Sequence, residues 1–272
     1  MVHDEYRAID AVNWSSLKSL RKSPLQYWHD RAAGYTEGTP AMRLGTLIHA
    51  LILEPHVVDS RFAIYPGKAR RGKAWESFVE ENPGREIVLA TEMTRGLRAA
   101  DAVRQHPLAF GCVFAGEAEQ VVTWTDPETG IKCKARTDLV NGKLVELKST
   151  GDVTPRTFAT VAARLGYHGQ IAFYLDGLTE SGRSVAPEPL MVVVESDEPY
   201  DVAVFTVPEE ELETGRCMYR RLLHRLKDCT EADSWPGVCN EEPLPLALPV
   251  WAFNEENEPD LPITCGGVAL EV

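Results

Sequence analysis

Strict alternation of apolar and polar residues predicts a β-hairpin near the middle of the chain. Residues 131–140 alternate along their whole length and residues 144–149 alternate again, which is the pattern of two half-buried strands. Asn141-Gly142 between them is a strong turn signal. Because side chains repeat every second residue, one face of the first strand is expected to carry Ile131, Cys133, Ala135, Thr137 and Leu139, and the other Lys132, Lys134, Arg136 and Asp138.

The length of the hairpin loop decides whether Asp138 and Glu146 meet. A two-residue loop at Asn141-Gly142 would leave Glu146 on the wrong face of the sheet. A three-residue loop over residues 141–143, closed by a left-handed glycine at Gly142, places Asp138 opposite Glu146. We expect the three-residue loop, because it also gathers three apolar side chains on one side: Leu139, Val145 and Leu147.

Other periodic segments outline an α/β chain. The expected elements are, in order, a helix at 41–54, a strand at 117–125, the hairpin, helices at 155–165 and 167–180, strands at 189–195 and 200–207, and a helix from 208 to about 227. The run 189–195 is almost continuously apolar, as in a strand that is covered on both faces.

Asp138 and Glu146 together form a candidate metal site. Two carboxylates side by side repel each other, and a divalent cation bound between them removes that repulsion. Hard oxygen ligands favour Mg²⁺ or Mn²⁺, and the backbone carbonyl of Leu147 could complete the coordination. Lys148 adds a positive charge beside an attacking water or a phosphate oxygen. On this pattern alone, the alternative is a surface salt bridge on a solvated hairpin.

Further polar residues lie on either side of the hairpin. His49 flanks the apolar stripe of the helix at 41–54, and Gly45, one turn earlier, is expected to leave room over its imidazole. Glu119 lies in the strand before the hairpin, with Glu117 as the alternative acid. A last pair, four residues apart on the second helix after the hairpin, shares one face: Gln170 and Tyr174.

Taken in order, these residues resemble the RecB-like branch of the PD-(D/E)xK nucleases. More closely, they resemble the RecE-type exonucleases (exodeoxyribonuclease VIII) of phages and prophages. The resemblance covers about residues 13–180 and rests on three strings, LGTLIHALILEP from Leu44 to Pro55, CKARTD from Cys133 to Asp138, and YHGQIAFY from Tyr167 to Tyr174. It implies an α/β fold with an α-β-β-β-α-β core, in which helices flank a central mixed sheet, with N-terminal helical and C-terminal extensions.

The resemblance also implies a role for each site residue. The implied metal ligands are His49, Asp138 and Glu146, and the implied catalytic or supporting residues are Glu119, Lys148, Gln170 and Tyr174. Lys148 would position or activate the attacking water, and Glu119 matches the acidic position of the family ahead of the hairpin. Gln170 and Tyr174 would brace the site or contact DNA.

The activity implied by the resemblance is metal-assisted hydrolysis of phosphodiester bonds at double-stranded DNA ends. Digestion would run from 5′ to 3′ and leave a 3′ single strand for annealing-type recombination. The expected partner is a single-strand annealing protein of the RecT type, and the expected assembly is a homo-oligomeric ring. The alternatives are a structure-specific or iron–sulfur nuclease on the same core, and a non-catalytic DNA-end-binding recombination protein.

A net charge of −13 argues against broad nonspecific adhesion to DNA but leaves room for local basic patches. The candidate DNA-binding residues are Lys134 and Arg136, on the expected catalytic face, and Arg70, Arg71 and Lys73, in a second cluster. A third cluster contains Lys18, Arg21 and Lys22. For the second and third clusters, an ordinary solvated surface is the alternative.

The chain has 272 residues without a linker-like segment or a repeat, so we expect a single nuclease domain over 1–272, with its core at about 41–207 and a C-terminal helix and tail at 208–272. The tail, with an apolar patch at 250–253, is interpreted as a wrapping extension or subunit contact. Six cysteines contain no C-x-x-C pair, which favours reduced thiols over an iron–sulfur cluster. Short apolar runs and the lack of a signal-peptide pattern predict an intracellular protein without a membrane partner. The resemblance to phage and prophage exonucleases implies the cytoplasm of a bacterial host cell.

Overall fold

The computed structural model describes residues 3–34, 38–239, 242–248, 264–265 and 268–269. The chain forms two compact units, Met1–Trp235 and Pro236–Val272. Within the second unit, strands β8 (Thr264–Cys265) and β9 (Val268–Ala269) pair in antiparallel fashion. The apolar patch at 250–253 lies outside the described residues.

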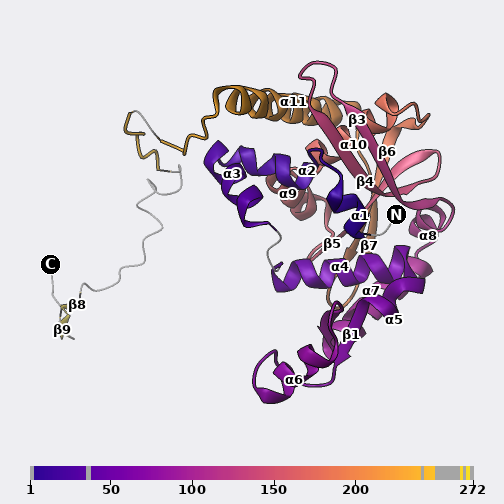
Figure 1. Cartoon of the computed structure of the whole chain (residues 1–272). Coiled ribbons are helices and arrows are strands. Elements are labelled where there is room, and N and C mark those ends of the chain that lie inside the picture. Colours follow the sequence, from indigo (N-terminus) through magenta and orange to yellow (C-terminus); the bar gives the residue numbers. More distant parts are fainter. Residues whose placement is uncertain (1–2, 35–37, 240–241, 249–263, 266–267, 270–272) are drawn as a thin grey trace. The chain divides into compact units, whose positions relative to one another are not determined.

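A five-stranded sheet with the order β3-β4-β5-β6-β7 forms the centre of the first unit (Figure 1). Its strands are β3 (Glu117–Thr125), β4 (Lys132–Val140), β5 (Lys143–Thr150), β6 (Ala186–Glu195) and β7 (Val202–Thr206). β5 and β6 are parallel and the other neighbours are antiparallel. Helices α9 (Pro155–Leu165) and α10 (Tyr167–Glu180) make the long connection that a parallel pair requires.

Helices cover both faces of this sheet. Met191 and Val193 of β6 face a core that contains side chains of α10, α11 (Glu209–Ala232) and the short α2 (Trp14–Leu17). Val192 and Val194 face a second core with side chains of α4 (Pro40–Leu53), α7 (Ala90–Gln105) and α8 (Pro107–Val113). The predicted α/β fold, a central mixed sheet flanked by helices, is therefore confirmed, as is the strand covered on both faces.

Strand β4 departs from the predicted facial pattern. Cys133 and Ala135 belong to the first core, whereas Leu139 belongs to the second, so the odd-numbered residues do not share one face. The change falls next to Glu119, which lies across from Asp138 in β3 and has a left-handed φ of 53°. A strand that twists beside such a backbone irregularity presents successive odd residues to different layers.

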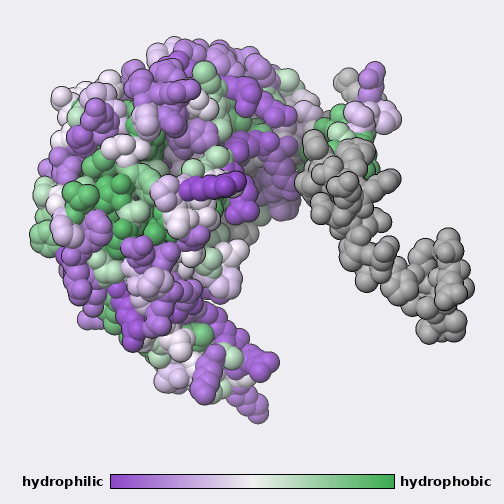
Figure 2. All heavy atoms as spheres, turned by 180° about the vertical axis from the view of Figure 1, so that it is seen from behind, coloured by the Kyte–Doolittle hydropathy of each residue, from purple (hydrophilic) through white to green (hydrophobic). Residues whose placement is uncertain are grey.

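The remaining elements lie at the periphery (Figure 1). They are α1 (His3–Ala8), η1 (Lys18–Arg21), α3 (Pro24–Ala33), η2 (Pro55–Val57), α5 (Val58–Arg61), β1 (Phe62–Tyr65), α6 (Lys73–Glu81) and β2 (Glu86–Leu89). β1 and β2 form a separate parallel pair, and β1 and α6 project away from the sheet beyond α4 and α7 (Figure 1). None of the described helices combines the length and apolarity needed to cross a bilayer. Seen from behind, most of the surface is hydrophilic and hydrophobic residues gather in one area of it (Figure 2).

Candidate active site

The hairpin between β4 and β5 has the predicted three-residue loop. Leu139 pairs with Val145 and Val140 with Leu144, and Gly142 has a left-handed φ of 79°. Glycine adopts this conformation without the steric cost that a Cβ atom would add. The register puts Asp138 level with Glu146, and it gathers Leu139, Val145 and Leu147 in the second core, as predicted.

β4 and β5 stop pairing at Asp138. Oδ2 of Asp138 accepts a hydrogen bond from the backbone N–H of Leu147 (2.7 Å), so a side chain replaces the next main-chain contact. At the start of β4, Val12 takes the place of β5. The N–H of Val12 donates to the Lys132 carbonyl, and the carbonyl of Val12 accepts from the Lys134 N–H, both at 2.8 Å. The opening between the diverging strands is where the polar site residues gather.

Glu146 is the most buried acid of the site, with a side chain 1% exposed. Its Oε1 accepts hydrogen bonds from Lys148 Nζ (2.6 Å), two residues along β5, and from Gln170 Nε2 of α10 (2.5 Å). Its Oε2 is buried and has no hydrogen-bond partner. Buried carboxylate oxygens are almost always satisfied in folded proteins, so an orphaned one requires an explanation.

His49 reaches the site from α4. Its Nδ1 lies 3.6 Å from Oδ1 of Asp138, so each carboxylate of the pair has a nitrogen-bearing neighbour. The prediction that Gly45 leaves room over the His49 imidazole is wrong. A Cβ atom there would approach Ser149 Oγ of β5 at 3.1 Å and no atom of the imidazole, so this glycine lets α4 pack closely on the sheet.

The two carboxylates have opposite pKa shifts. Burial, together with the charge of Asp138, raises the pKa of Glu146 to about 7, against the lowering effect of Lys148. Burial alone would raise the pKa of Asp138, but the His49 charge and hydrogen bond, Lys148 and the Leu147 N–H bring it below its ordinary value. The pair therefore favours one fixed negative charge on Asp138 and one exchangeable proton on Glu146.

Glu119 completes the acidic side of the site. Ala118 pairs with Leu139 and Gln120 with Thr137, which leaves Glu119 across from Asp138. Burial and the charge of Asp138 raise the pKa of Glu119 to about 7, although its carboxylate lies 2.6 Å from Arg136 Nε. Glu117 is exposed, whereas the Glu119 side chain is only 16% exposed, so Glu119 is the acid that lies at this site.

These positions follow the D…E-x-K order along two strands of a mixed sheet. Residues 13–242 match the model of a family described as a PDDEXK-like domain of unknown function (DUF3799). The chain belongs to this PDDEXK-like family. It is thereby placed in the PD-(D/E)xK nuclease superfamily. No curated protein matches the chain.

One solved structure shares the fold of this PDDEXK-like protein over nearly its whole length. It is a chain from Eubacterium rectale described as "Putative exonuclease", with a TM-score of 0.63, 13% identity, and coverage of 94% of this chain and 98% of that chain. Such a likeness concerns the fold. A second structure, SSO0001, matches at a TM-score of 0.31 and 11% identity over 75% of this chain and 85% of that one, and carries no argument.

An arginine-lined cavity of about 420 Å³ opens beside Asp138. Its basic residues are Arg7, Arg43, Arg61 and Arg136. Tyr174 of α10 also lines it, while Gln170, one turn earlier, reaches Glu146. The pair predicted on one helix face is thus brought to the site. Of these arginines, only Arg136 was predicted from the sequence. The position of Arg43, six residues before the metal-ligand candidate His49 on α4, was the available signal for another.

Besides Arg136, which pairs with Glu119 and still lines the cavity, two of the proposed DNA-binding residues have other contacts. Lys134 is 5% exposed, and its Nζ donates to the carbonyls of Tyr6, Arg7 and Ile9, so it anchors the N-terminal segment. Arg70 makes two hydrogen bonds to the Glu92 carboxylate and one to the Ile87 carbonyl. The sequence predicted that both side chains would be free to contact DNA phosphates. Instead, contacts with residues distant in sequence occupy both of them. Arg71 and Lys73 are exposed at the start of α6.

The donor set is suited to a hard cation that keeps its own water ligands. Among the residues described, no three His, Cys, Asp or Glu side chains lie close enough to enclose a metal ion. Mg²⁺ rarely needs such a cage, because one or two carboxylates, waters and substrate phosphates usually complete its octahedron. The unpartnered Oε2 of Glu146 and the neighbouring carboxylate of Asp138 supply such a pair of oxygens. The N–H of Leu147 points at Asp138, and because the N–H and C=O of one strand residue point to the same side of the strand, its carbonyl faces the same way.

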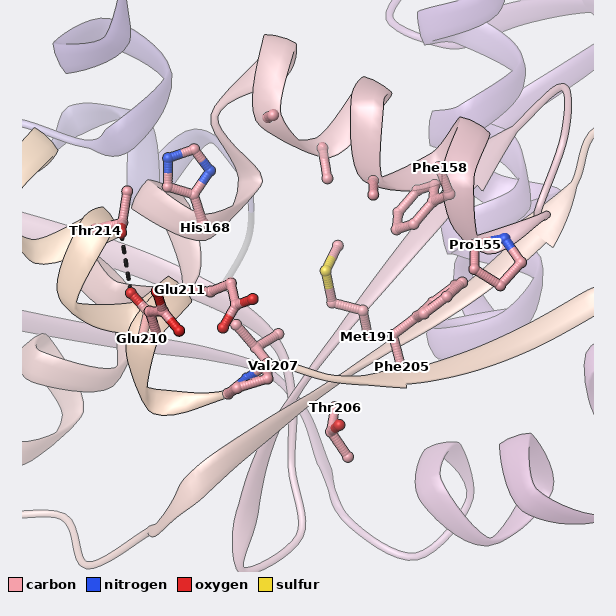
Figure 3. Close-up of a pocket in the computed structure, with 14 residues that line it drawn as sticks. Pro155, Phe158, His168, Met191, Phe205, Thr206, Val207, Glu210, Glu211 and Thr214 are labelled. Carbon is pink, nitrogen blue, oxygen red and sulfur yellow. Dashed lines mark hydrogen bonds between the residues drawn. The ribbon is translucent and has the colours of Figure 1, made fainter.

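A second large cavity, of about 580 Å³, lies between α9, β7 and the start of α11 (Figure 3). Its apolar wall contains Phe158, Met191 and Phe205, and Glu210 and Glu211 stand at one end. None of the proposed site residues lines it. The five cysteines with described side chains are free, and Cys133 is buried in the first core.

Proposed function

We propose that this protein is a metal-dependent DNA exonuclease that hydrolyses phosphodiester bonds at the ends of double-stranded DNA. The observation that carries the proposal is the geometry of Glu146. One of its oxygens is held by Lys148 and Gln170, and the other is buried without a partner beside a second carboxylate. Leaving such an oxygen unsatisfied costs stability, so this arrangement is explained by a ligand that binds there.

Asp138 and Glu146, with His49 and the Leu147 carbonyl, would hold Mg²⁺ or Mn²⁺. When bound, the cation would lower the pKa of a water and offset charge on the phosphate. The side chains around it have separate tasks. Gln170 fixes the orientation of Glu146, and Lys148 places an ammonium group where phosphoryl oxygens gain negative charge.

The cavity beside Asp138 supports a polyanionic substrate. Four arginine side chains are among the residues that line it, and so is Asp138, whose carboxylate would bind the metal. Arg136 is held by Glu119 and Arg61 by Glu86, so both guanidinium groups are oriented before DNA arrives. Fixed cations of this kind position a phosphate backbone without reading its sequence.

Polarity and partner rest on the resemblance to RecE-type exonucleases. We propose digestion from 5′ to 3′, a 3′ single-stranded product, a RecT-like annealing protein as partner and a ring-shaped homo-oligomer. The likeness in fold to a chain described as "Putative exonuclease" supports the exonuclease part of the proposal.

The test compares linear duplex DNA with a covalently closed circle of the same sequence. We expect the linear substrate to be degraded with Mg²⁺ or Mn²⁺ and to survive in EDTA, and the circle to survive in both. Asp138→Asn and Glu146→Gln should each lose about a thousandfold or more in rate with a native circular dichroism spectrum, because both would remove a metal ligand. Glu117→Gln, an exposed acid on the same strand as Glu119, is the control and should keep full activity.

Cleavage of the circle at the rate of the linear duplex would replace the exonuclease assignment with an endonuclease. Full activity in EDTA, or in the Asp138→Asn protein, would overturn the metal-dependent mechanism altogether.

A further inference from the structure

A second basic surface lies close to the catalytic lysine. An open groove of about 590 Å³ is lined by four cations, Lys18, Arg21, Lys22 and Arg164. Lys18 and Arg21 belong to η1, and Lys22 is the residue that follows it. Arg164 comes from the last turn of α9. These segments lie on the same side of the molecule in Figure 1, although more than 140 residues separate them in sequence.

A continuous set of contacts connects this groove to Lys148. The Nζ of Lys148 lies 5.0 Å from the centre of the Tyr167 ring. Tyr167 follows Gly166, where a Cβ atom would come within 2.7 Å of Arg21 Nη1. The same Nη1 donates to the carbonyl of Arg164 at 3.0 Å. The positively charged side of the active site and the groove are therefore neighbours.

The cations of the groove are not neutralised by the protein itself. In the described part of the chain, none of the four has a carboxylate oxygen within 4.0 Å, whereas Arg61, Arg95 and Arg136 each have one. Asp30, the acid that lines the groove, accepts hydrogen bonds from Ser19 and Gln26 instead.

Like charges also act on one another inside this group. Lys18 is exposed at the surface, but partial desolvation by its neighbours and the charges of Lys148 and Arg21 together lower its pKa. Gathering unpaired cations costs free energy. The chain has 41 Asp and Glu residues and 28 Lys and Arg residues, so acids that could have neutralised these cations are plentiful. A ligand that brings several negative charges at regular spacing would remove that cost.

We propose that this groove binds the phosphate backbone of the DNA substrate where it runs past the Lys148 side of the catalytic centre. The inference rests on the proposed nuclease function and names a surface that this function requires. Contacts from Lys and Arg to phosphates are independent of sequence, and each one releases counterions from the DNA. The salt dependence of binding therefore reports how many such contacts exist.

The experiment measures the affinity of full-length protein for a fluorescent linear duplex in EDTA, where no cleavage occurs, over a range of salt concentrations. The test variant is Lys18→Ala/Lys22→Ala, because both lysines are exposed and their loss does not open the core. The matched control is Lys143→Ala/Lys227→Ala, which removes the same charge from lysines outside the groove. A third variant, Lys18→Arg/Lys22→Arg, restores the charge.

We expect the groove variant to bind about tenfold more weakly at low salt, and the slope of log affinity against log salt to fall by about 1–2, since each lost duplex phosphate contact removes about 0.9. The control should keep the slope of the natural protein, and the arginine variant should recover it. Equal slopes for the groove variant and the control would overturn the proposal that the groove binds DNA phosphates. That result is distinct from failure of the proposed function, which would show as absent metal-dependent cleavage by the natural protein.

Discussion

Lys148 Nζ lies 2.6 Å from one oxygen of Glu146, while the other oxygen of the same carboxylate has no partner. Burial lowers the pKa of Lys148, whereas the carboxylates of Glu146 and Asp138 raise it. The net effect is a raised pKa, so the lysine stays charged. Above the pKa of Glu146, which is about 7, the pair therefore places a fixed cation and a half-satisfied anion in the interior. Such a pair does not maximise stability, because desolvation offsets much of its attraction.

Removing only the cation should be costly. We expect Lys148→Met to lower the free energy of unfolding by roughly 3–5 kcal/mol at pH 8, because it leaves a buried carboxylate without its counter-charge. The double variant Glu146→Gln/Lys148→Met should recover most of that loss while remaining inactive. Urea denaturation measures both.

Lys143→Met is the control for this comparison. Lys143 pairs with an exposed glutamate, Glu188, and should lose less than about 1 kcal/mol. A Lys148→Met protein as stable as the control would show that the Glu146 pair is not buried as described.

Metal binding should be visible in stability without any substrate. A ligand that binds only the folded state stabilises it by about 2.7 kcal/mol at one hundred times its Kd. We expect Mg²⁺ or Mn²⁺ to raise the melting temperature of the natural protein by several degrees, at roughly 2–4 °C for each kcal/mol. The rise should disappear in Asp138→Asn and persist in Glu117→Gln. An equal rise in all three proteins would place the bound ion somewhere else.

Much of the site could be predicted because its centre is local. Next to the loop, the period of two fixes which residues share a strand face, and Gly142 favours the three-residue loop, so the approach of Asp138 and Glu146 follows from short-range rules. The same period fails farther from the loop, where Cys133 and Ala135 lie in the other core. The contact between Gln170 and Glu146 could be inferred only through the resemblance, because α10 and β5 meet through tertiary packing.

Other features depend on contacts that no local pattern contains. Lys134 alternates with apolar residues as if it faced solvent, yet the N-terminal segment folds over it and binds its ammonium through three carbonyls. Arg70 sits in a run of basic residues but pairs with Glu92 of α7. The parallel pair β1–β2 was missed as well, since two four-residue strands give too short a signal.

The left-handed backbone of Glu119 gives a prediction that separates strain from charge. Its φ of 53° is costly for any residue with a Cβ atom. Glu119→Gly and Glu119→Ala both lose the contact with Arg136, but the glycine variant should be more stable by about 1 kcal/mol.

At Gln120, the neighbouring residue without a positive φ, the order should reverse, with Gln120→Ala the more stable. Thermal or urea unfolding of the four proteins provides the comparison. Equal stability of the two Glu119 variants would rule out the left-handed conformation.

Packing of α10 against β3 depends on the absence of a side chain at Gly177. A Cβ atom there would lie 2.5 Å from Cζ3 of Trp124, well inside normal contact distance, and Trp124 in turn packs on Phe173 with ring centres 4.7 Å apart. Because the tryptophan cannot move without disturbing this aromatic contact, Gly177→Ala should destabilise the fold by roughly 1–3 kcal/mol. Gly111→Ala is the matched control, since a Cβ atom in that helix meets nothing within 4 Å and alanine is the better helix former. Combining Gly177→Ala with Trp124→Leu should recover part of the loss by making room. Additive effects of the two substitutions in urea denaturation would contradict direct contact between these residues.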